Sequence, residues 1–293
     1  MDNSAKLSRR SALTVMGGAT VGVAAASVSA QESSDSRGQI PLKGRLKQSV
    51  CQWCYEGMPL DDLCRHSAAI GLKSVELLGE SDWATTKKYG LTCAMANGPS
   101  GISPGWNRPQ DHDALVKESE RLLPLVADAG LPNMILFSGN REGMPDAEGL
   151  KNCAKGIKRI TALAEEVGVT LCMELLNSKR NHKDYQCDHT PWGVDLVNEV
   201  GHGSFKLLYD IYHMQIMEGD VIDTIRENFE HIAHFHTGGV PGRNEIDDTQ
   251  ELNYRRICEA IVELGYDGYL AQEFIPVHDP MESLAHAARI CDV

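Results

Sequence analysis

Residues 171–177, LCMELLN, place one carboxylate, Glu174, inside a short apolar run that is typical of a buried β-strand. A polar residue at the end of such a run recurs three times further along the chain. The later stretches are LLYDIYH (207–213, with Asp210), AHFHTGG (233–239, with His236) and LAQEFIP (270–276, with Glu273). The four polar residues are 36, 26 and 37 residues apart, close to the length of one strand–helix unit in a (β/α)8 barrel. These stretches therefore predict an α/β protein built as a single (β/α)8 barrel.

The rest of the chain alternates strand-like and helix-like segments as such a barrel requires. The strand-like segments are mostly continuous apolar runs, as expected for parallel strands covered on both faces. We predict strands at 46–53, 74–79, 91–97, 133–139, 169–176, 205–212, 231–237 and 268–275. Helix patterns occupy 59–70, 111–129, 147–167 and 250–264, and a glycine suited to a left-handed cap follows each of them. Pro124 should kink or split the helix at 111–129.

The first thirty residues are typical of an export signal. Ser8 to Ser11 read SRRS, a twin-arginine pair, and an apolar stretch (12–26) and a small-residue cleavage site (28–30) follow. The apolar stretch is about 15 residues long, which is too short for a comfortable membrane span. An uncleaved anchor or a cytosolic tail is the alternative. We expect residues 1–30 to direct twin-arginine export to the periplasm or an equivalent compartment, with 31–44 as a polar tether and 45–293 as the catalytic barrel.

Charge and cysteine content narrow the class of protein. The formal net charge is −13, which argues against nucleic-acid or anionic-membrane binding, because phosphate contact depends on lysine and arginine. An acidic chain of this size favours a protein that handles small molecules. The nine cysteines are an odd number and do not indicate a disulfide framework. Cys51 and Cys54 have the spacing of a redox or zinc pair, but no second pair follows, so two packed thiols are the favoured interpretation.

The ends of the last four predicted strands carry the chemistry. Because parallel barrel strands converge at their C-terminal ends, Glu174, Asp210, His236 and Glu273 should meet at one mouth. Three carboxylates and an imidazole make an oxygen-rich site for a divalent metal. The two glutamates can also accept and return a proton, so we predict an enzyme with Glu174 and Glu273 as acid and base. For a single one of them, a structural ion pair is the alternative.

Further polar residues near strand ends are candidates for substrate contact. His213 follows Asp210 by three residues, and a satisfied structural histidine is its alternative. Arg243, in the turn PGRNE (241–245), has a guanidinium suited to a carboxylate or a polyol oxygen, although a surface arginine in such a turn is equally expected. His234 alternates with His236 and either orients it or simply packs. Weaker candidates are Trp53, Glu76, Trp83, Asn97, Lys183 and, best of this group, His182.

The chain resembles the xylose isomerase-like barrels, and most closely their hydroxypyruvate isomerase branch. The matching stretches are VELLGESDW, LCMELLN, LLYDIYHMQ, HIAHFHTGGVPGRNEID with the later ELNY, and YLAQEFIP. The resemblance implies one divalent ion, usually Mn2+ or Mg2+, held by Glu174, Asp210, His236 and Glu273. It also implies that the two glutamates act as acid and base and that His213 and Arg243 contact a small hydroxy-carbonyl acid or sugar. A homo-oligomer is expected by analogy.

Two departures from that branch keep other functions open. Its members often carry glutamine where this chain has His236, which is the residue of the related ketose 3-epimerases. Those epimerases tend to have an acidic residue about six positions after the first metal glutamate, where this chain has Arg180. We therefore predict an aldose–ketose type isomerase, with a ketose 3-epimerase or a non-catalytic exported sugar- or metal-binding protein as alternatives. An endonuclease IV-like phosphodiesterase would need more metal histidines and a basic groove.

Overall fold

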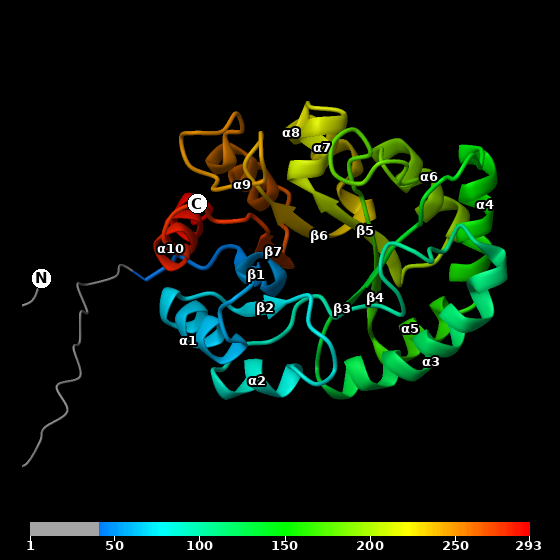
Figure 1. Cartoon of the computed structure of the whole chain (residues 1–293), viewed down its shortest axis with the longest axis horizontal. Helices are drawn as coiled ribbons and strands as arrows, with labels where there is room; N and C mark the ends of the chain where they lie inside the picture. Colours follow the sequence, from blue (N-terminus) through cyan, green and yellow to red (C-terminus); the bar gives the residue numbers. More distant parts are fainter. Residues whose placement is uncertain (1–40) are drawn as a thin grey trace, which may run out of the picture. The chain divides into compact units, whose positions relative to one another are not determined.

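The computed structural model describes residues 41–293, so the predicted signal at 1–30 and most of the predicted tether lie outside the described residues. A curled parallel sheet forms the inner wall of the barrel, and the helices lie around it (Figure 1). Its strand order is β2-β1-β7-β6-β5-β4-β3. The strands are β1 (Lys47–Cys51), β2 (Ser74–Glu76), β3 (Asn133–Leu136), β4 (Thr170–Glu174), β5 (Phe205–Asp210), β6 (Ile232–Thr237) and β7 (Tyr269–Gln272).

The predicted strand at 91–97 closes the gap between β2 and β3 without forming a regular strand. Leu77 N donates to Met95 O at 2.9 Å, and Ile135 N donates to Ala96 O at 3.0 Å, so the segment pairs with both neighbours. At Ala94, side chains of the neighbouring strands take the place of backbone hydrogen bonds. Ser74 Oγ accepts from the Ala94 amide, and Asn133 Nδ2 donates to the Ala94 carbonyl. The pairing is therefore interrupted, but eight segments complete the predicted barrel.

The helices largely follow the predicted pattern. They are α1 (Leu60–Ile70), α2 (Trp83–Lys88), α3 (His112–Asp128), α4 (Asp146–Ile157), α5 (Thr161–Val167), α6 (Thr190–Val200), α7 (Ile211–Met217), α8 (Val221–Asn228), α9 (Tyr254–Glu263) and α10 (Pro280–Ile290), with short 3-10 turns η1 (Gln52–Tyr55), η2 (Pro109–Asp111) and η3 (Phe229–His231). The helix predicted at 147–167 is in fact two, α4 and α5. The helix α3 continues through Pro124 without being split. The four glycines that follow the predicted helices all have positive φ, as expected of left-handed caps.

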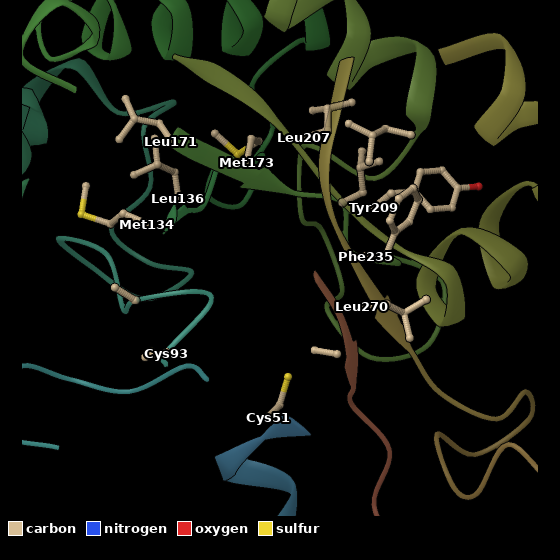
Figure 2. Packing of buried hydrophobic residues seen from close by; sticks show 14 of the residues in the cluster. Cys51, Cys93, Met134, Leu136, Leu171, Met173, Leu207, Tyr209, Phe235 and Leu270 are labelled. Carbon is tan, nitrogen blue, oxygen red and sulfur yellow. The ribbon is translucent and has the colours of Figure 1, made fainter. Parts of the chain in front are cut away.

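Two apolar layers support the mouth of the barrel. The larger one fills the space between sheet and helices, and Figure 2 shows part of it, including Leu171, Leu207 and Phe235. The smaller one contains Met95, Ile135, Cys172 and Leu208. Two residues beyond Cys172 and Leu208 on the same strands come Glu174 and Asp210, so the alternation of a strand places these carboxylates on the same side as the smaller layer. The apolar layer thus forms a base for polar side chains.

Two further observations concern the predicted class of protein. All nine cysteines are buried and free, which agrees with packed thiols at Cys51 and Cys54. Burial raises the pKa of both of these thiols, so neither is poised as a reactive thiolate.

Among the described residues, no helix combines the length and the apolar character that crossing a membrane requires.

Candidate metal centre and active site

The four predicted ligands come together at the C-terminal ends of four neighbouring strands. Glu174 and Asp210 are the last residues of β4 and β5, His236 is the last but one of β6, and Glu273 directly follows β7. Each offers one ligand atom, and these four atoms lie within 4.8 Å of one another. All four side chains are buried. The structure therefore gathers the residues that the spacing in the sequence placed at one mouth.

The imidazole of His236 is held between two sets of carboxylates. Its Nδ1 lies 3.2 Å from Glu174 Oε1 and 2.8 Å from Glu273 Oε2. Its Nε2 lies 3.0 Å from Oε1 of Glu76, which also accepts from His234 Nε2 at 2.7 Å. Burial opposes ionisation of Glu76, but the two histidines outweigh it and lower its pKa to about 2. An ionised carboxylate can only accept, so Nε2 carries a proton. Burial opposes a charge on His236, but the Glu273 carboxylate outweighs it and holds the pKa of His236 well above its ordinary value, so Nδ1 is protonated as well. Nδ1 is the atom that faces the ligand cluster, and a bound cation would take the place of its proton.

The Arg243 side chain is buried, which decides against a surface arginine. Its guanidinium is 3.2 Å from Asp210 Oδ2, forms a second ion pair with Glu273, and donates through Nε to the Glu273 carbonyl. The rings of Trp53 and Tyr212 lie 5.0 Å and 5.2 Å from the guanidinium carbon. Trp53 Nε1 also donates to Glu273 Oε1 at 2.7 Å. Arg243 and Trp53 together fix the carboxylate of Glu273.

His213 is in the same cluster because β5 turns directly into α7. The Asp210 side chain accepts from the His213 amide at 3.0 Å and so caps α7, while His213 Nε2 lies 3.5 Å from Asp210 Oδ2. Asn177, which the sequence did not single out, is 2.5 Å from His213 Nδ1. Burial holds the pKa of His213 well below its ordinary value, so the ring is neutral. The His182 ring packs edge-on against His213, with 5.1 Å between the ring centres.

Charge in this cluster is unbalanced. Burial raises the pKa of Glu174 and holds that of Asp210 well above its usual range. Burial opposes ionisation of Glu273 as well, but the charges of Arg243 and His236 outweigh it and hold its pKa well below the ordinary value. Three carboxyl groups, those of Glu174, Asp210 and Glu273, share the single Arg243 guanidinium and the His236 imidazole. Such a deficit of positive charge is what a bound divalent cation would relieve.

Two unsatisfied atoms support the same conclusion. Glu174 Oε1 and His236 Nδ1 are buried and have no hydrogen-bond partner, although they lie close to one another. Buried polar atoms are rarely left in this state unless an ion or water completes them. An oxygen-rich set with one imidazole suits Mn2+ or Mg2+ better than a thiol-preferring metal. The residues present therefore fit a divalent ion.

A cavity of about 820 Å3 lies over this cluster. Its lining contains Glu174 and Glu273 but neither Asp210 nor His236, so the predicted acid and base are the two ligands that a substrate would meet. His182, Arg243, Trp53 and Asn97 line it as well. Leu77, Ile135 and Phe137 form apolar walls that sequence patterns did not indicate.

Two of the weaker candidates lie elsewhere. Trp83 is buried, and its indole donates to the Leu78 carbonyl at 3.1 Å. Lys183 lines a separate surface hollow with Arg141 and Asp184. Neither of them lines the cavity over the cluster.

The geometry agrees with comparisons to known proteins. Residues 66–291 match the family described as xylose isomerase-like TIM barrel. The chain belongs to this family. The family and the fold predicted from the sequence are thereby confirmed.

Curated relatives in the xylose isomerase-like family are named as isomerases and epimerases. The chain is 38% identical over 109 residues to the 2-oxo-tetronate isomerase of Cupriavidus necator, a match that covers 37% of this chain and 41% of the relative. It is 32% identical over 123 residues to the D-psicose 3-epimerase of Ruminiclostridium cellulolyticum, covering 41% and 39%. These two matches span about two fifths of each relative. A Mus musculus protein that carries the provisional name hydroxypyruvate isomerase is 24% identical over 250 residues, covering 80% and 90%.

A solved structure extends the likeness to the whole barrel. AP endonuclease, family 2 from Brucella melitensis superposes with a TM-score of 0.73 at 22% identity, covering 83% of this chain and 99% of the other. At this level of identity the likeness shows the fold alone. Function has to be argued from the site.

Proposed function

We propose that the protein is a metal-dependent isomerase that interconverts hydroxy-carbonyl acids or sugars of the aldose–ketose type. The observation that carries the proposal is the convergence of Glu174, Asp210, His236 and Glu273 within 4.8 Å, with the two glutamates lining a cavity. The similarity to relatives named as isomerases supports it. Assembly into a homo-oligomer stays a prediction.

The four residues would hold the ion, and Mn2+ or Mg2+ suits their oxygen-rich set. When bound, the ion would supply positive charge that stabilises an enediolate. The substrate class follows from this chemistry, because a carbonyl and a hydroxyl on adjacent carbons are needed to form an enediolate.

The side chains of the cluster would transfer protons, orient one another and bind the substrate. One glutamate takes the proton from the carbon that bears the hydroxyl, and the other, or the same one, returns a proton to the neighbouring carbon. The hydroxyl proton passes to the former carbonyl oxygen, so that the carbonyl and hydroxyl groups exchange places. Trp53 and Arg243 keep the Glu273 carboxylate in one orientation, which is the pre-organisation that proton transfer requires. Arg243 and His182 line the cavity and are placed to bind substrate oxygens. His213, predicted as a substrate contact, is fully buried outside the lining and lies against Asp210 and Asn177. The apolar walls of the cavity limit the access of water to the reacting carbons.

Uptake of deuterium from D2O tests this chemistry directly. Full-length protein would be incubated with hydroxy-carbonyl acids and ketoses, with and without Mn2+ or Mg2+, and each compound analysed by mass spectrometry. Metal-dependent uptake into one compound is expected. Absence of uptake over the whole panel, in protein shown to contain metal, would contradict the proposal.

Substitution of either glutamate should remove the exchange. Glu174→Gln and Glu273→Gln keep the size of each side chain but cannot accept the proton, so the exchange rate should fall by roughly 100- to 10,000-fold. Glu199→Gln is the matched control, because Glu199 is half exposed on α6 in a surface pair with Lys158. Full activity in either active-site variant would overturn the acid–base roles.

A ketose 3-epimerase is the second candidate. His236 and the similarity to a D-psicose 3-epimerase favour it, whereas Arg180, where the epimerases tend to have an acid, is exposed and does not line the cavity. The position of the deuterium separates the two. An epimerase returns the proton to the carbon from which it was taken, whose configuration changes, whereas an isomerase delivers it to the adjacent carbon, the former carbonyl carbon. A non-catalytic binding protein would bind sugar and label neither.

A further inference from the structure

A second cavity, here the outer cavity, opens beside the one over the metal cluster, here the inner cavity. Its volume is about 760 Å3. Its lining comes from the segments that follow the first and the last strand. These are residues of 53–66 after β1, and Ile275, Pro276 and Pro280 after β7. Trp53 belongs to the lining of both cavities. The outer cavity therefore adjoins the candidate active site, with Trp53 as the residue common to both.

The size of the two cavities exceeds what a three-carbon acid needs. The inner cavity alone has about 820 Å3, within the range of roughly 300–1,000 Å3 that drug-sized ligands occupy. A three-carbon acid would leave most of that space to water. The second volume next to it indicates a longer substrate, of which only one end reaches Glu174 and Glu273.

The outer cavity combines apolar surface with two acidic side chains, one arginine and one histidine. Trp53, Tyr55, Met58 and Ile275 provide flat or apolar contact surface. Among the described residues, the large apolar side chains that remain exposed are Ile275, at 43%, and Val277, at 64%, both in the loop after β7. Ile275 also lines the outer cavity and adds exposed apolar surface to it.

Charges in the two cavities argue against an acidic ligand. Arg65, in the outer cavity, pairs with Asp62 at 2.7 Å. Arg243, in the inner cavity, pairs with Asp210 and Glu273. In each cavity the acidic side chains outnumber the arginine, so neither lining has an excess of positive charge. A neutral ring with one apolar face and several hydroxyls matches this lining, because its face can pack on Trp53 or Tyr55 while Asp62 and His66 accept or donate hydrogen bonds.

We propose that the outer cavity is a subsite for a neutral sugar ring that is joined by a glycosidic bond to the sugar reacting in the inner cavity. The proposal rests on the proposed function and makes its substrate class more specific: a disaccharide or glycoside with a hydroxy-carbonyl unit at one end. Trp53 lies at the junction and is fixed there by its hydrogen bond to Glu273 and by Arg243 over its ring.

A comparison of one ketose with its disaccharides tests the subsite. The Mn2+-loaded full chain would be given D-fructose, lactulose or isomaltulose in D2O; the two disaccharides carry the same reducing ketose linked through different hydroxyls. We expect kcat/KM for deuterium uptake to be about tenfold higher for at least one disaccharide, the low end of what one apolar contact contributes to discrimination. Equal values for all three sugars would overturn the subsite.

Two substitutions in the same loop provide the matched pair. Ile275→Asn places a polar group in the outer cavity and keeps the backbone bond from the Ile275 amide to the Arg243 carbonyl. It should reduce the ratio of disaccharide to monosaccharide kcat/KM by about tenfold. Val277→Asn is the control, because Val277 is more exposed and does not line the cavity. An unchanged ratio in Ile275→Asn, or an equal reduction in Val277→Asn, would contradict the assignment.

Calorimetric binding of lactulose separates failure of the subsite from failure of the isomerase. If no sugar takes up deuterium but lactulose binds, and Ile275→Asn alone weakens binding, the subsite stands and the isomerase does not. If D-fructose exchanges but the disaccharides neither exchange nor bind, the isomerase stands and the subsite is wrong. If nothing exchanges or binds, both are wrong.

Discussion

Glu76 lies at the end of β2, fully buried, and its carboxylate faces the imidazoles of His234 and His236. A carboxylate behind a metal-binding histidine fixes the tautomer and orientation of the ring, and its loss typically weakens metal affinity by roughly 10- to 100-fold. Glu76→Gln keeps the volume but offers a neutral amide. We therefore expect the dissociation constant for Mn2+ to rise by about that factor.

Calorimetry on chelator-treated protein measures this affinity without any assay of activity. Glu199→Gln again serves as the control, and circular dichroism should show that both variants are folded. A Glu76→Gln protein that binds Mn2+ as tightly as the unchanged chain would show that Glu76 only fills space between the histidines.

The candidate ligands were predictable as single residues because each stands at the end of an apolar run. Such runs form parallel strands, and the C-terminal ends of parallel barrel strands meet at one mouth. Glu76 has a similar setting in VELLG, but nothing in its own run indicates that two histidines from a distant strand approach it. Arg243 shows the opposite case. Its turn is typical of a surface, yet Trp53 and Tyr212 pack against its guanidinium, and Asp210 and Glu273 pair with it. Such contacts depend on tertiary structure and leave no local pattern.

Among the elements, strands were predicted more reliably than helix limits. Strand runs are apolar on both faces and stand out, whereas helix ends depend on single capping contacts. β5 ends at Asp210 and not at 212 because the Asp210 side chain caps α7, and α9 begins at Tyr254 because Asn253 accepts from the Arg256 amide. The segment at 91–97 was expected as a regular strand, yet Ser74 and Asn133 satisfy part of its backbone. Side-chain substitutes of this kind are invisible in a hydropathy pattern.

The closure of the barrel at that segment depends on close backbone approach at Gly98. A Cβ at this position would lie 1.9 Å from the carbonyl oxygen of Ile135, which is backbone and cannot move aside alone. Gly98→Ala should therefore lower the free energy of unfolding by about 1–3 kcal/mol. Gly79→Ala is the matched control, because a Cβ there meets no atom within 4 Å. Thermal unfolding of both variants measures the effect, and equal melting temperatures would show that the segment adjusts freely.

At the scale of the whole molecule, the sequence indicates one barrel and one mouth but gives no sign of two adjoining cavities. Segments 53–66 and 275–280 meet only because the barrel closes β1 against β7. The candidate metal site also depends on the complete barrel. Its four candidate ligands lie on four strands and come within reach of one another only when the barrel has formed. A chain exported with a metal bound inside the cell would therefore keep that metal only if it crossed the membrane already folded.

We propose that residues 1–30 direct such export through a twin-arginine route, and substitution of the arginine pair tests it. Arg9→Lys with Arg10→Lys keeps the charge but removes the pair, so the protein should stay in the cytoplasm with its first thirty residues attached. The unchanged chain should be recovered outside the cytoplasm with Gln31 as its first residue, as fractionation and mass spectrometry would measure. Lys6→Gln is the control, because it alters the charge near the pair and leaves the pair intact. Export of the double-lysine variant at the normal level, or of the unchanged chain from a host without the twin-arginine route, would show that the segment is not a twin-arginine signal.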